Sequence, residues 1–137
     1  MKVLFDTHII LDVLLKREPF AAAASQLMAA VERDEIEGFL GATTVTTLFY
    51  LMAKTLGKAA AEENLHLLLR LFKVATVNQS VIETALDSDY ADFEDAVLYS
   101  AAALIGCNAI VTRNVKDFKA STVPVYASDE LLAILGV

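Results

Sequence analysis

The stretch KVLFDTHIILD, residues 2–12, decides the fold prediction because an apolar run of strand length ends at an aspartate. Val3, Leu4 and Phe5 predict a short buried strand, and Asp6 follows at its end. An unpaired carboxylate at the border of a core is costly, so Asp6 needs a backbone donor, a basic side chain or a metal ion as its partner. The simplest alternative to a metal site is that Asp6 caps the helix that follows.

The rest of the chain alternates between strand and helix patterns. The expected strands cover residues 2–5, 36–42, 73–77, 108–112 and 123–127. The expected helices cover residues 19–35, 44–57, 58–72 and 92–106, with a short helix that starts at a Ser80–Glu83 capping box and a last helix capped by Ser128. This alternation predicts a single α/β domain over residues 1–137, with a central, mainly parallel five-stranded sheet covered on both faces. In such sheets ligands bind at the carboxyl ends of the strands where strand order reverses, so neighbouring first and fourth strands would bring Asp6 and residues 112–118 together.

Composition narrows the function classes. The 137 residues are 56% hydrophobic, which is enough for one sizeable core, and the net charge is −7. That charge argues against broad electrostatic binding of nucleic acid, although a cation converts an acidic site into one that binds phosphate. We expect no membrane span, because polar residues and glycine interrupt the longest apolar region. The single cysteine, Cys107, excludes an internal disulfide and is typical of a reducing compartment, so we expect a cytoplasmic protein.

Oxygen-bearing side chains gather at three predicted strand ends or helix starts. They are Asp6; Asp92, Glu94 and Asp95; and Asn114 and Asp117. Mg²⁺ and Mn²⁺ prefer hard oxygen ligands, and Mg²⁺ keeps several waters while taking only one or two carboxylates. Such ions polarise phosphodiesters and stabilise the leaving oxygen during hydrolysis.

Three segments, VLFDTHIILDVLL, DFEDAVLYSAA and IVTRNVKDF, resemble the signature blocks of the PIN domain family, which includes toxin ribonucleases of the VapC type. The blocks occur in order, and the resemblance extends from residue 2 to about residue 125. It implies a three-layer α/β/α fold and a magnesium- or manganese-dependent endonuclease that acts on RNA. It also implies a homodimer and, for a toxin, a small antitoxin protein that blocks the crevice.

The resemblance assigns roles to individual residues. Asp6 matches the family's first acid and Asp95 its third, while either Asn114 or Asp117 matches the fourth ligand position. The expected catalytic carboxylates are therefore Asp6, Asp95 and Asp117, and the expected metal ligands include Asn114 as well. Thr112 matches the hydroxyl residue that follows the fourth strand.

One position departs from the family pattern. The second acid belongs in the helix after the second strand, but residues 40–57 contain no acid, and Thr47 most nearly occupies its place. His8 stands where related proteins often carry asparagine. We expect both side chains to lie near the metal or the substrate, and metal affinity depends on whether the remaining acids suffice.

Five further residues have expected roles beside the site. Asp92 precedes a helix and should cap it, leaving Asp95 for the metal. Arg113 and Lys116, together with Lys119, form a basic spot on an acidic chain that suits a phosphate backbone. Asp12 should pair locally, with Lys16 one turn further on.

The sequence thus favours a metal-dependent endoribonuclease, as the toxin of a toxin–antitoxin pair. The main alternative is a PIN fold with a weakened metal site that binds RNA or a protein partner without cutting, which the missing acid supports. A purely structural oligomerisation module would leave the grouped acids unexplained.

Overall fold

The first strand of the chain lies in the middle of a parallel sheet. The computed structural model describes residues 1–118 and 121–136. Within them, five strands form one sheet in the order β3-β2-β1-β4-β5, and each neighbouring pair is parallel. The strands are β1 (Lys2–Phe5), β2 (Glu37–Gly41), β3 (Lys73–Ala75), β4 (Ala109–Val111) and β5 (Val125–Tyr126). This confirms the expected parallel sheet.

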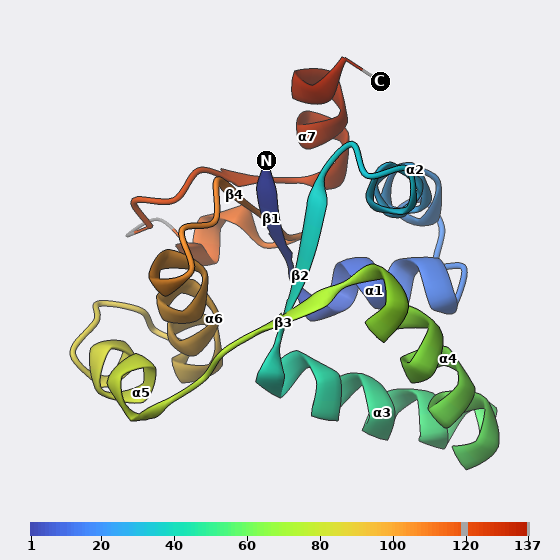
Figure 1. Ribbon diagram of the computed structural model, residues 1–137, viewed down its shortest axis with the longest axis horizontal. Helices are drawn as coiled ribbons and strands as arrows, with labels where there is room; N and C mark the ends of the chain where they lie inside the picture. Colours follow the sequence, from blue (N-terminus) through green and yellow to red (C-terminus); the bar gives the residue numbers. More distant parts are fainter. Residues whose placement is uncertain (119–120, 137) are drawn as a thin grey trace.

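Helices cover both faces of this sheet, which gives the expected three-layer α/β/α arrangement (Figure 1). One layer contains α1 (Thr7–Leu14), α2 (Ala21–Glu32), α3 (Ala42–Leu56), α4 (Lys58–Leu71) and α7 (Ser128–Leu135). The opposite layer contains α5 (Gln79–Leu86) and α6 (Phe93–Leu104), together with the short 3-10 helix η1 (Val115–Phe118).

The central strand is apolar on both sides because both of its faces are covered. Val3 and Phe5 pack in the cluster under α1–α4 and α7, whereas Leu4 packs in the cluster under α5 and α6. All three side chains are fully buried. The Phe5 ring meets the Phe72 ring edge to face, with 5.0 Å between centroids. A continuous apolar run is what a strand in a doubly covered parallel sheet requires.

Gly41 allows α6 to approach the sheet closely. It ends β2, and a Cβ atom added there would collide with the Leu98 side chain of α6. Leu98 lies three residues after Asp95, one turn along the same helix. The missing side chain at Gly41 therefore sets how near the start of α6 comes to the carboxyl end of the sheet.

Strand order reverses between β1 and β4. Phe5 pairs with Val111, and the Asp6 amide donates a hydrogen bond to the Val111 carbonyl at 3.0 Å. Asp6 and Thr112 consequently leave neighbouring strands side by side, as expected for the switch point of such a sheet.

Two helix starts differ from the expected caps. The cap of α5 is Asn78, whose side chain accepts a hydrogen bond from the Val81 amide at 3.0 Å, and Ser80 lies inside the helix. The last helix is preceded by Ala127 rather than capped by Ser128, and the Glu130 carboxylate accepts from the Ala127 amide at 2.8 Å. In both cases a side-chain oxygen two positions from the expected serine accepts a hydrogen bond from one free amide at the helix start.

Across residues 1–118 and 121–136, no helix combines the length and the apolar composition that a membrane crossing requires.

Candidate functional site

A hollow of about 260 Å³ opens at the carboxyl ends of β1 and β4 and brings the three acidic segments together. We call it the acidic cleft. Its lining includes the acids Asp6, Asp92, Glu94, Asp95 and Asp117, the polar residues Thr7, His8, Thr47 and Asn114, and the apolar residues Leu51 and Leu98. Every expected metal ligand lies here, so the parallel sheet gathers side chains that are up to 111 residues apart in the sequence (117 − 6).

Asp6 is fixed in place through both carboxylate oxygens. Its Oδ1 accepts a hydrogen bond from the Thr7 amide at 2.8 Å, which caps α1. Its Oδ2 accepts from the Thr112 hydroxyl at 2.7 Å, and Asp6 is only 8% exposed. Hydrogen bonds to a charged carboxylate are stronger than neutral ones. Asp6 therefore caps the helix and also faces the cleft in one fixed orientation.

Hydroxyl groups extend this network behind Asp6. The Thr112 hydroxyl also accepts a hydrogen bond from the Asn114 amide at 3.1 Å, which shapes the turn after β4. The Thr7 hydroxyl donates to the Thr44 hydroxyl at 3.1 Å, linking the start of α1 to the start of α3. Thr7 and Thr44 are buried, and sequence reasoning did not assign them a role here. The available signal was a hydroxyl residue shortly after each strand: Thr7 is two residues beyond β1, and Thr44 is three residues beyond β2.

Asp95 lies in the most electronegative part of the cleft. It is in the first turn of α6, where the Asp92 side chain accepts from the Asp95 amide at 3.1 Å and so caps the helix as expected. Burial, and after it the charges of Asp92, Asp6, Asp117 and Glu94 in that order of importance, together raise the pKa of Asp95 to about 7. The carboxylates therefore repel one another, and the cleft favours whatever brings positive charge, a proton or a cation.

The donor set suits a water-rich divalent cation. Among residues 1–118 and 121–136, no three Asp, Glu, His or Cys side chains lie close enough to form a metal cage by themselves. Mg²⁺ does not need such a cage, because it binds through one or two carboxylates and keeps several waters. Asp6 and Asp95 supply hard oxygens, and Asn114 and Asp117 supply two more from the loop after β4. These residues fit an open, hydrated site.

Two of the other predicted residues line the cleft. Thr47 of α3 faces it from the position where an acid was expected, and His8 of α1 faces it from an exposed position. The His8 Nδ1 atom lies 3.4 Å from the Arg17 guanidinium. The structure thus places a threonine and a histidine where they can contact a substrate or a bound water.

Two residues of the predicted basic spot, Arg113 and Lys116, are not among those that line the cleft. Lys116 is exposed on η1, and Lys119 falls outside the described residues. The Arg113 Nη2 atom lies 3.1 Å from Asp12 Oδ1, so the expected pairing of Asp12 with Lys16 is wrong. Asp12 is fully buried and points at the loop after β4, and Arg113, rather than a neighbour along the helix, reaches it. Burial raises the pKa of Asp12, and the charge of Arg113 opposes that rise.

Comparison with known proteins agrees with this fold. A family model described as PIN domain matches residues 2–116. The chain belongs to the PIN domain family. This PIN domain is 22% identical over 134 residues to Ribonuclease VapC1 of Aquifex aeolicus (strain VF5), a match that covers 94% of this chain and 92% of that protein.

Solved structures show the same fold. VapBC2 from Rickettsia felis, solved bound to a DNA fragment from its promoter, superposes with a TM-score of 0.71 and 15% identity over 93% of this chain and 98% of that one. A toxin–antitoxin complex from Klebsiella pneumoniae gives a TM-score of 0.70 and 23% identity over 92% of this chain and 97% of that one. The fold predicted from the three signature blocks is confirmed.

Proposed function

We propose that this PIN domain is a metal-dependent endoribonuclease whose active site is the acidic cleft. The observation that carries the proposal is the arrangement of Asp6 and Asp95, one carboxylate fixed by two hydrogen bonds and the other with a pKa of about 7. Support also comes from the Aquifex aeolicus relative, which is described as a ribonuclease.

Five residues in or beside the cleft have proposed tasks. Asp6, Asp95 and Asp117, with Asn114, would hold Mg²⁺ or Mn²⁺, which supplies positive charge to the scissile phosphodiester when it is bound. Thr112 keeps the Asp6 carboxylate in one orientation. Asp95 lies among four other acids, so a bound cation would relieve their repulsion and favour the charged form of Asp95.

The solved structures of toxin–antitoxin complexes support a partner protein. We propose that a small antitoxin covers the acidic cleft, because several of its acids are exposed and repel one another, and a cationic side chain would relieve that repulsion. A homodimer and a cytoplasmic location complete the proposal and stay predictions.

One observation favours the non-cutting alternative. Thr47 occupies the place of the second acid, and among the described residues that line the cleft the only one able to carry positive charge is His8. A PIN domain that lacks one metal-binding acid and has little positive charge in its cleft would bind RNA or a protein without hydrolysing it. The missing acid lowers the number of ligands, whereas the retained carboxylates still supply one or two, which is the number that Mg²⁺ takes.

Cleavage of a mixed RNA pool with Mn²⁺ tests the proposal. Compared with the wild-type protein in Mn²⁺, we expect cleavage to disappear in EDTA and in the Asp95→Asn variant. The matched control is Asp34→Asn, an exposed aspartate in the loop before β2, which should cut at the wild-type rate. Cleavage that persists in EDTA or in Asp95→Asn would refute the mechanism. Absence of cleavage together with calorimetric binding of Mn²⁺ would favour the non-cutting module.

A further inference from the structure

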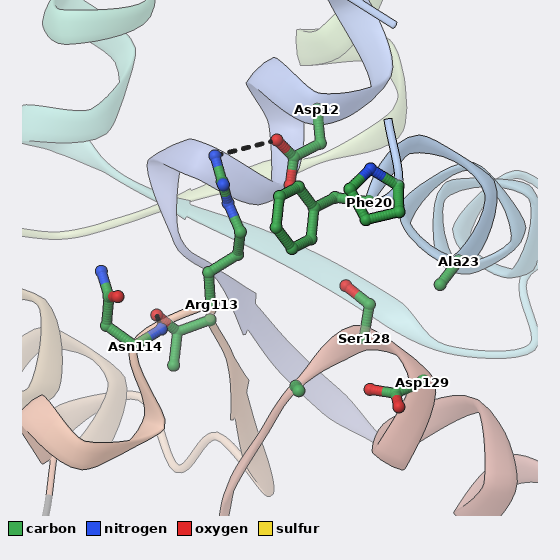
Figure 2. Close-up of a pocket in the computed structure, with 10 residues that line it drawn as sticks. Asp12, Phe20, Ala23, Arg113, Asn114, Ser128 and Asp129 are labelled. Carbon is green, nitrogen blue, oxygen red and sulfur yellow. Dashed lines mark hydrogen bonds and ion pairs between the residues drawn. The ribbon is translucent and has the colours of Figure 1, made fainter. Parts of the chain in front are cut away.

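A second hollow, of about 460 Å³, opens beside the acidic cleft. We call it the Phe20 pocket; Figure 2 shows Phe20 and Ala23 on one side of it, Arg113 and Asn114 on another, and Ser128 and Asp129 facing them. Asn114 lines both hollows, and Thr112, which bonds to Asp6, lines this one. The three-residue turn after β4 is therefore the wall between the acidic cleft and the Phe20 pocket. A strand of RNA with a phosphate in the cleft would place a neighbouring nucleoside at this pocket.

The aromatic wall of the pocket is held in place. The Arg113 guanidinium lies 4.1 Å from the centroid of the Phe20 ring, and Arg113 is in turn paired with the buried Asp12. Phe20 is nevertheless 41% exposed, so part of the ring is open to a ligand. A ring that a cation contacts and that is partly exposed suits the stacking of another planar group, as nucleobases stack on aromatic side chains in single-strand sites.

The base of the pocket is polar and incompletely satisfied. Neither Asp12 oxygen accepts a well-formed hydrogen bond, although Arg113 lies within ion-pair distance, and the Arg113 Nε atom also lacks an acceptor among the described residues. Buried polar atoms are nearly always hydrogen-bonded in folded proteins. An apolar wall over a few converging polar groups is the usual make-up of a small-molecule site.

The charge of the pocket indicates what it accepts. Asp12 offsets the charge of Arg113, and Asp129 adds a negative charge at the start of α7. The Asp129 side chain is exposed and makes no hydrogen bond or ion pair within residues 1–118 and 121–136. The pocket therefore disfavours phosphate and favours a neutral group that presents N–H donors to a carboxylate.

We propose that the Phe20 pocket binds the base of a nucleotide next to the scissile phosphate and prefers guanine. Guanine has two adjacent N–H donors on one edge, which together match the two oxygens of a carboxylate. The base would stack on Phe20 while Asp129 accepts from that edge. This inference rests on the proposed function, in that the ligand is taken to be RNA.

Binding of RNA pentamers tests the proposal without any cutting. The pentamers have the sequence UUNUU, with each of the four bases at N, and bind to protein carrying Asp95→Asn so that they stay intact. Dissociation constants come from fluorescence anisotropy. In this background we expect the guanine pentamer to bind tightest, and Asp129→Asn to make all four bind alike. Phe20→Ala should weaken binding by roughly tenfold, the size typical of losing one base–aromatic stack.

Three further variants guard against trivial explanations. Phe20→Leu keeps an apolar side chain at the start of α2 and should weaken binding as Phe20→Ala does, with an unchanged circular dichroism spectrum. Ile134→Ala removes an exposed side chain of the same helix as Asp129, and Asp34→Asn removes a distant exposed carboxylate; neither should alter binding.

The outcomes separate this inference from the proposed function. The proposed base subsite is wrong if all four pentamers bind equally to the Asp95→Asn protein, or if both Phe20 variants bind them unchanged. Either result decides this even if the wild-type protein cuts RNA. Guanine-dependent binding supports the subsite even if no cleavage occurs. If both Asp129→Asn and Phe20→Ala abolish binding of a Gly-Arg-Gly peptide but leave the RNAs unaffected, the pocket accepts a side chain of a protein partner and the proposal is wrong.

Discussion

Replacing Asp95 by asparagine should stabilise the protein at alkaline pH while it abolishes cleavage. Burial and four neighbouring acids raise the pKa of Asp95 from 3.8 to about 7. The folded protein therefore holds this proton more tightly than the unfolded chain does. Between pH 3.8 and about 7 the folded state binds more protons, so the Asp95 contribution to the free energy of unfolding falls as pH rises through that window. Asparagine removes this cost because it carries no charge.

The size of the effect follows from the shift. A rise of roughly 3 units in the pKa of Asp95 corresponds to about 4 kcal/mol in the free energy of unfolding, since one pKa unit is worth about 1.4 kcal/mol. Asp95 is partly exposed, and water screens its interaction with the other carboxylates. We therefore expect Asp95→Asn to raise the free energy of unfolding by ~1–2 kcal/mol at pH 8 and by close to nothing at pH 4.

Urea denaturation in EDTA at both pH values measures this difference directly. Asp34→Asn serves as the control for removing an exposed carboxylate and should leave stability unchanged. Adding Mn²⁺ should stabilise the wild-type protein more than the variant, because a ligand that binds only the folded state raises its stability. The electrostatic reasoning is refuted if the variant and the wild type have the same free energy of unfolding at pH 8. It is also refuted if their difference is equally large at pH 4.

Three further substitutions probe other parts of the structure by urea denaturation. Arg113→Met should lower the free energy of unfolding at pH 8 by about 3 kcal/mol, because it leaves the buried Asp12 carboxylate without its ion-pair partner; a loss below about 1 kcal/mol would contradict that. Gly41→Ala should cost about 1–3 kcal/mol and weaken Mn²⁺ binding in calorimetry, because its Cβ collides with Leu98 and displaces the start of α6; unchanged Mn²⁺ affinity would count against the close-approach argument. Lys73→Ala should leave the free energy of unfolding unchanged, because its 2.6 Å ion pair across the sheet edge is largely exposed; a measurable loss would contradict this.

Local patterns predicted the middle of the sheet well because β1 and β4 are buried on both faces. The apolar run before Asp6 and the run at 108–112 each had the length and composition of a covered strand, and both became strands. Their adjacency did not follow from either run alone. The rule for parallel sheets placed Asp6 near residues 112–118 only on the condition that the two strands are neighbours, and the structure supplies that pairing.

Long-range partners were harder to predict than elements. Asp12 and Arg113 are separated by a hundred residues, and a helical pattern shows only neighbours three or four positions away, so Lys16 looked like the natural partner of Asp12. The hydroxyl pair of Thr7 and Thr44 was missed for the same reason. Their contact depends on the distance between α1 and α3, which the packing of the core sets.

The sequence predicted the cap of α6 correctly but not the caps of α5 and α7. Asp92 matched its expected role because its side chain reaches the amide three residues on. At the last helix Ser128 had the right residue type, but the backbone becomes helical one residue earlier, and Glu130 supplies the acceptor instead. A shift of one residue is beyond what a capping preference can resolve.

The hydrogen bond between Thr112 and Asp6 also determines when the cleft can form during synthesis of the chain. The two residues are 106 positions apart, and β1 occupies the middle of the sheet, so the cleft cannot assemble until the segment through Asp117 has been synthesised and paired. A nascent chain, or one truncated before β4, would carry Asp6 with its helix cap alone. Any activity of the cleft therefore arises only after residue 117 has been synthesised and β4 has paired with β1.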